Sequence, residues 1–157
     1  MPGDGGLIVT LADWMVKQLA ALQHGGSTVF QIAALFKHQL RAVSGGIEGI
    51  EKTPAVYVGY MNSDAAREGG RDLREILEFD VLIVVKSKEA AVSKWGDSSH
   101  LGISKIRDLV ITLFDKKRPD DIVIDCDEFY YTGDFLTIDT PDISGIQMRF
   151  EVSRMNN

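Results

Sequence analysis

Carboxylate side chains gather in one stretch of the chain and are its most plausible source of chemistry. Paired carboxylates can serve as general acid and base, and several together can hold a divalent cation. This stretch lacks the Asp-x-Asp-x-Asp-Gly spacing of an EF-hand loop. We favour a solvated acidic face, and a second interpretation is that this face lines something negative that must be repelled. A pair of carboxylates acting as general acid and base stays an alternative, because the fold and not the sequence spacing decides which carboxylates lie close together. The carboxylates are Asp120, Asp121, Asp125, Asp127, Glu128, Asp134, Asp139 and Asp142.

Other reactive residue types lack the spacing that catalysis or metal binding needs. The histidines, His24, His38 and His100, form no His-x-x-x-His pair. No Ser lies in a Gly-x-Ser-x-Gly elbow, and residues 45–53 lack the Gly-Lys step of a phosphate-binding loop. Cys126 is predicted on the inward side of a strand, where a thiol is normally inert. The sequence therefore predicts no catalytic residue, no metal site and no cofactor, and we expect a protein that is not an enzyme.

Two amphipathic helices are predicted from apolar residues at helical spacing. The first covers about residues 10–23, with Thr10 as its N-cap. The second covers residues 103–114, where Ser98 or Ser99 is a candidate cap.

Several strands surround these helices. Residues 55–61 and 79–86 are apolar on both faces, which is typical of central, covered strands. Segment 28–43 is ambiguous, and we predict a short strand at 29–32 followed by a helical or irregular stretch. Further strands are predicted at 121–131, 135–139 and 146–152, the last alternating apolar and polar residues.

The order of elements predicts the fold class. Regular β-α-β alternation is absent, so we expect an α+β fold, with a mixed or antiparallel sheet packed against two amphipathic helices. Residues 1–157 form one domain in this interpretation, with residues 1–7 and 153–157 flexible.

A charged segment, residues 62–75, separates the two central strands. It mixes both signs of charge, so we predict a projecting hairpin arm that forms salt bridges with a neighbouring subunit. A mobile surface loop is the alternative. The interface candidates in the arm are Arg67, Glu68, Arg71, Asp72, Arg74 and Glu75.

Composition narrows the function classes. The 157 residues include 17 Lys and Arg against 23 Asp and Glu, a net charge of −6. Nucleic-acid binding relies on clustered cations, so a general nucleic-acid binder is disfavoured. No apolar run approaches the roughly 18 residues of a spanning helix, and no signal peptide is apparent. We therefore expect a soluble, intracellular protein that does not contact a membrane.

The element order resembles that of a Mu-type phage and prophage family of tail-terminator-like proteins. The resemblance covers about residues 8–152. It is carried by the first helix, residues 53–60 (Thr-Pro-Ala-Val-Tyr-Val-Gly-Tyr), the charged hairpin, residues 78–85 (Glu-Phe-Asp-Val-Leu-Ile-Val-Val), and the later helix and terminal strand.

The resemblance implies a subunit of a ring, expected to be a hexamer, that caps the tail tube, stops its polymerisation and offers a face for joining the head. The implied partners are copies of the chain itself, the tail tube protein and a head-completion or connector protein. DNA would pass through without specific binding, along an acidic lumen for which Asp121, Asp125 and Asp127 are candidates. The expected location is the host cytoplasm during assembly and then the virion tail.

Two other functions stay open. One is a different virion or tube component, such as a connector or minor tail protein. The other is a small-ligand or metal-dependent enzyme that uses the carboxylates of residues 120–142.

Overall fold

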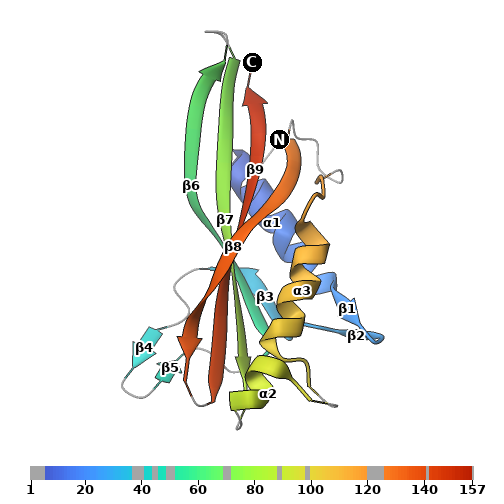
Figure 1. Ribbon diagram of the computed structural model, residues 1–157. Coiled ribbons are helices and arrows are strands. Elements are labelled where there is room, and N and C mark those ends of the chain that lie inside the picture. Colours follow the sequence, from blue (N-terminus) through green and yellow to red (C-terminus); the bar gives the residue numbers. More distant parts are fainter. Residues whose placement is uncertain are drawn as a thin grey trace.

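The fold is a five-stranded sheet with helices packed against one face (Figure 1). The computed structural model describes residues 6–36, 41–43, 46–48, 52–68, 72–87, 90–97, 100–119, 126–140 and 142–156. The helices are α1 (Gly6–Ala21), α2 (Ala90–Trp95) and α3 (Ile103–Phe114). The strands are β1 (Gln23–His24), β2 (Ser27–Thr28), β3 (Ile32–Leu35), β4 (Arg41–Val43), β5 (Gly46–Glu48), β6 (Ala55–Glu68), β7 (Asp72–Lys86), β8 (Cys126–Asp139) and β9 (Ile143–Asn156). The predicted α+β class is confirmed.

The main sheet has the order β3-β6-β7-β9-β8. Strand β3 runs parallel to β6, and every other neighbouring pair is antiparallel. Strands β1 and β2 form a small separate hairpin closed by Gly25 and Gly26, both of which have positive φ and so suit a two-residue turn. Strands β4 and β5 form a second small hairpin.

The predicted helices are confirmed, with corrections at their starts. Thr10 lies inside α1, and its hydroxyl donates to the Gly6 carbonyl at 2.8 Å. It is therefore not the N-cap. Helix α3 has Gly102 as its N-cap residue, without a side-chain cap. The proposed caps Ser98 and Ser99 lie outside the described residues.

The main core lies between the helices and one face of the sheet. Helix α1 contributes Leu11, Met15 and Leu19, and the sheet contributes the alternating residues that the sequence predicted in β9, all of them buried. Aromatic rings fill its centre. Trp14 stacks on Phe129 at 5.7 Å between ring centroids, and Phe114 meets Phe150 edge-on at 5.4 Å. Such burial is the main source of folding free energy.

A separate projecting arm is not confirmed. Residues 62–68 continue β6 and residues 72–75 begin β7, and the two strands pair from Ala55↔Val84 to Glu68↔Asp72 with one bulge between Tyr60 and Asn62. Strand β7 also pairs with β9 as far as Leu73↔Asn156. The segment is thus the far end of the main sheet. Of its charged side chains that the structure describes, Asp64 and Arg74 are exposed and Glu75 pairs with Arg154.

Two other predictions of secondary structure need correction. The short strand predicted at 29–32 begins only at Ile32, as β3, and the stretch after it, predicted to be helical or irregular, is strand at 33–35 and again in β4. The two strands predicted around Gly133 are one strand, β8, which absorbs register shifts as bulges instead of turning. The C-terminal segment 153–157, expected to be flexible, is β9 as far as Asn156. At the other end of the chain, residues 6 and 7, also expected to be flexible, lie in α1.

The sheet face opposite α1 and α3 is here called the helix-free face. It carries a small second apolar cluster of Val84, Ile138 and Ile143 at one end of the sheet. By register the face also carries the apolar residues Ile76, Leu82 and Phe135, together with polar and charged side chains. Among the described residues, no helix is long and apolar enough to cross a membrane.

Candidate functional site

The outer edges of the main sheet are the candidate functional site. An edge strand presents backbone N–H and C=O groups that can pair with another chain. Here the outermost strands are β3, which covers only the first part of β6, and β8.

The first half of β8 is protected by the turn that follows α3. Backbone hydrogen bonds join Lys116 N–H to the Phe129 carbonyl at 2.7 Å and Phe129 N–H to the Lys117 carbonyl at 2.9 Å. The Tyr131 N–H donates to the Asp115 carboxylate at 3.0 Å. These bonds satisfy the outer edge of β8 as far as Tyr131.

The second half of β8, residues 133–139, is here called the β8 edge segment. In the described part of the chain, its backbone pairs with β9 alone. Phe135 and Leu136 in this segment are 55% and 46% exposed. Their exposure is unusual for large apolar side chains in adjacent positions, and it places apolar surface beside an open backbone edge.

A second open edge lies on the opposite side of the sheet. Strand β3 pairs with β6 up to Leu35↔Val58, and the Phe36 N–H donates to the Val58 carbonyl at 2.8 Å. Residues 61–68, here called the β6 edge segment, pair only with β7 within the described residues. Met61 at its start is 49% exposed, and Tyr60 beside it is also exposed.

The two edge segments lie at opposite ends of the sheet as well as on opposite sides. The β6 edge segment is level with the beginning of β7, since Asp64 pairs with Ile76. The β8 edge segment is level with the end of β7, since Leu136 pairs with Ile146, which pairs with Ile83. Figure 1 shows β6 reaching the top of the sheet and β8 ending near the bottom.

The charged residues predicted in the arm are only partly placed. Arg67, Glu68 and Asp72 lie on the strands with side chains outside the described set, and Arg71 lies outside it altogether. Arg74 is exposed. Glu75 is paired inside the chain, because its carboxylate accepts from Arg154 at 2.9 Å and both groups are largely buried. Glu75 thus has an ion-pair partner within the chain.

Of the three residues predicted to line an acidic lumen, the structure describes Asp127. Asp121 and Asp125 lie outside the described residues. Asp127 is exposed, accepts from the Ser153 hydroxyl at 3.2 Å, and lies 3.8 Å from Arg118. Ser153 is on the helix-free face by its register, so Asp127 borders that face.

An ion pair dominates the electrostatics of the helix-free face. Asp80 is 5% exposed and accepts from Arg149 Nε at 3.0 Å and from the Gln147 amide. The Asp80 hydrogen bond, followed by its charge, raises the pKa of Arg149, and the nearby Glu78 and Glu151 add to this effect. The cation at the middle of this face is thus surrounded by carboxylates.

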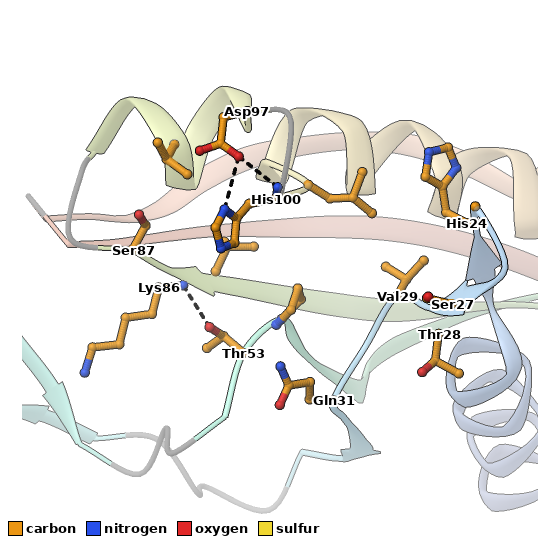
Figure 2. Close-up of a pocket in the computed structure, with 15 residues that line it drawn as sticks. His24, Ser27, Thr28, Val29, Gln31, Thr53, Lys86, Ser87, Asp97 and His100 are labelled. Carbon is orange, nitrogen blue, oxygen red and sulfur yellow. Dashed lines mark hydrogen bonds and ion pairs between the residues drawn. The ribbon is translucent and has the colours of Figure 1, made fainter.

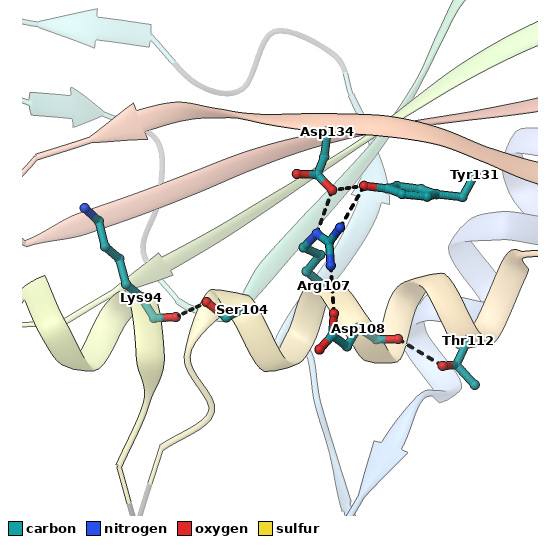
Figure 3. A network of polar contacts seen from close by, with 7 residues as sticks. All are labelled: Lys94, Ser104, Arg107, Asp108, Thr112, Tyr131 and Asp134. Carbon is teal, nitrogen blue, oxygen red and sulfur yellow. Dashed lines mark hydrogen bonds and ion pairs between the residues drawn. The ribbon is translucent and has the colours of Figure 1, made fainter.

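Asp134, one of the clustered carboxylates, belongs to a structural network between α3 and β8 (Figure 3). It accepts from Arg107 Nε at 2.6 Å and from the Tyr131 hydroxyl, while Arg107 also donates to Asp108 at 2.8 Å. The hydrogen bond to Asp134 is the main cause that raises the pKa of Arg107. Asp139 likewise pairs with Lys94 at 2.9 Å. These carboxylates therefore face cations on separate elements, and no group that could hold a metal occurs among the described residues.

A pocket of about 680 Å³ lies between the β1–β2 hairpin, the ends of β6 and β7, and the loop before α3 (Figure 2). His100 donates its backbone N–H to Asp97 at 2.9 Å, and its ring Nδ1 lies 3.1 Å from the same carboxylate oxygen. Both side chains are exposed, and Figure 2 shows His24 at the far end of the pocket from His100. The contact closes a local turn, and the two imidazoles do not converge on one point.

The β6 edge segment overlaps the interface arm predicted at residues 62–75, whereas the β8 edge segment was not identified from the sequence. The available signal was the pair Phe135 and Leu136, which interrupts polar–apolar alternation between Gly133 and Thr137. Adjacent residues of a strand lie on opposite faces, so one large apolar side chain must lie away from the core.

In comparisons with known proteins, no protein-family model and no curated protein matches this chain.

Proposed function

We propose that the chain is a structural subunit of a phage-type tail, which assembles into a ring on the end of the tail tube, stops tube polymerisation and provides the face that joins the head. The observation that carries this proposal is the pair of open edge segments on one sheet. Two different free edges favour contacts that repeat from copy to copy, and such contacts generate rings when the rotation closes. The resemblance in element order supplies the tail role and the expected number of six subunits.

The charge of the helix-free face supports a DNA conduit in this ring. By their register, the carboxylates on or beside this face outnumber its cations, and Arg149 is neutralised by Asp80. A channel through which a genome slides benefits from repulsion, because clustered cations would hold the phosphates. We assign this face to the lumen, with Asp127 at its border. The members described with side chains are Asp64, Glu78, Asp80, Asp127 and Glu151 against Arg74, Lys86, Arg149 and Arg118, which lies beside Asp127.

The proposed partners are further copies of the chain, the tail tube protein and a head-completion protein. The proposed location is the host cytoplasm during assembly and the virion tail afterwards. A connector or another tube component would use the same edges, but a tube component is expected to form long stacks unaided, whereas a terminator stops at one ring. Electron microscopy of the purified protein separates these two outcomes.

The decisive experiment deletes this reading frame from the prophage that carries it and examines induced lysates by electron microscopy. We expect headless tails of scattered, abnormal length, restored to uniform length by the wild-type chain supplied in trans. Normal-length tails joined to heads would overturn the proposal.

A further inference from the structure

We infer that two copies of this chain associate by antiparallel pairing of the β6 edge segment of one copy with the β8 edge segment of the next, so that the sheet continues from subunit to subunit. This inference deepens the proposed function and rests on it for the idea of a ring. The pairing itself follows from the two edge segments, and its test does not depend on the tail function.

Strand direction permits this pairing. Strands β6, β7, β9 and β8 alternate in direction across the sheet. If the next copy has the same orientation, its β6 lies antiparallel to β8 of the first copy. The antiparallel ladder then continues across the boundary without reversing a subunit.

The lengths of the two segments also match. The β6 edge segment has eight residues and the β8 edge segment has seven, and both end at strand termini. Their midpoints are offset by seven positions along β7, from Ile76 to Ile83, or about 23 Å at roughly 3.3 Å per residue. Joining them therefore displaces each copy along the strands. In a closed ring such a stagger requires strands tilted from the ring axis, as in barrels.

Exposed apolar side chains concentrate at the same two edges. Of the eight large apolar side chains that are exposed among the described residues, Tyr60, Met61, Phe135 and Leu136 lie in or next to these segments. A second copy would cover both groups in one contact. Pairing one edge with itself through a two-fold axis would leave the other edge of each dimer open, so the head-to-tail contact uses the surface more completely.

Cysteine cross-linking tests the pairing. In a Cys126→Ser background, Ala65→Cys is placed in the β6 edge segment and Thr137→Cys in the β8 edge segment, both at exposed positions. Strands β7 and β9 separate these positions within one chain, and the stagger separates them further, so a short bis-maleimide cannot join them inside a subunit. We expect the double variant to give a ladder of covalent oligomers on denaturing gels, and each single variant to give none.

The controls assign every outcome. Dimers from a single variant would mean that one edge pairs with itself, which overturns the head-to-tail contact. If the protein forms oligomers in solution but the double variant gives no covalent ladder, the contact lies elsewhere and this inference is overturned. The deletion experiment would still decide the tail function. The pairing of Ala65→Cys with Asp13→Cys, an exposed position on α1, reports random collision and should give no ladder.

A charge test provides a second, independent readout. Met61→Lys and Leu136→Lys each add a charge at an exposed position, so the fold should survive, with unchanged circular dichroism. We expect at least a tenfold weaker self-association by analytical ultracentrifugation. Trp95→Lys, at a 73% exposed position on α2, is the matched control and should associate like the wild type. Unchanged association in both edge variants, or a wild-type chain that is monomeric at millimolar concentration, would overturn the inference.

Discussion

Asp80 on β7 and Arg149 on β9 lie directly opposite each other in the sheet, and their side chains meet at 3.0 Å on the helix-free face. Asp80 is buried, whereas Arg149 is 42% exposed. The arginine therefore covers the carboxylate and supplies its hydrogen bonds together with Gln147.

Replacing Arg149 should destabilise the fold, because the buried Asp80 carboxylate then loses its cation. We expect Arg149→Met to lower the free energy of unfolding by about 2 kcal/mol, because one partner of a buried pair is removed. In the double variant with Asp80→Asn, the loss should be smaller than in Arg149→Met alone. Urea denaturation measures both values. Asp64→Asn, an exposed carboxylate on β6, is the control and should change stability by less than about 0.5 kcal/mol. A loss in the double variant as large as in Arg149→Met would contradict the prediction that the unpaired Asp80 carboxylate carries the cost.

The junction between α2 and α3 should tolerate no side chain at Gly102. A methyl group there would overlap the backbone of Gly96 and Trp95, which cannot move aside as a flexible side chain would. We expect Gly102→Ala to lower the free energy of unfolding by about 3 kcal/mol. At Gly59, the nearest atom to a new methyl is Phe36 Cβ at 3.7 Å, an ordinary contact. Gly59→Ala should therefore be nearly neutral, and similar thermal unfolding of the two variants would contradict the prediction.

Trp14 should be replaceable by Phe but not by Ala. Its ring stacks on Phe129, yet its buried indole N–H has no hydrogen-bond partner among the described residues. Trp14→Phe loses apolar area but also removes a donor whose desolvation costs about 1–3 kcal/mol, so the net change should stay within about 1 kcal/mol. Trp14→Ala leaves a cavity and should cost about 3–5 kcal/mol. A large loss in Trp14→Phe would indicate that the N–H is bonded in solution.

Stability should fall at high pH partly through Tyr57. Burial raises the pKa of its phenol above the ordinary value of about 10. The folded state then holds the proton more tightly than the unfolded state does. The resulting stability is complete below the unfolded pKa and is lost as the pH rises through the folded pKa. Denaturation between about pH 9 and 12 should show a smaller decline in Tyr57→Phe than in wild type. Tyr130→Phe, which changes an exposed ring, should decline like the wild type.

The sequence alone determined the α+β class, the two long helices and the inward face of β9. Each of these follows from local periodicity, since apolar residues at helical or alternating spacing must share a buried face. The alternation of Ile146, Met148, Phe150 and Val152, for example, gives the buried side of β9 directly. The extension of β6 and β7 through residues 62–75 was missed because exposed strand residues carry no apolar pattern.

Only the tertiary structure decided which edges are open and which carboxylates are engaged. Asp134 is held by Arg107, 27 positions away, and Glu75 by Arg154, 79 positions away. Such pairs depend on strand register and helix placement, which no local spacing records. The same reason applies to β8, whose first half is protected by the turn after α3 while residues 133–139 pair only with β9 in the described chain. An edge is open when no other strand pairs with it, and a strand's own residues do not specify which strands lie beside it.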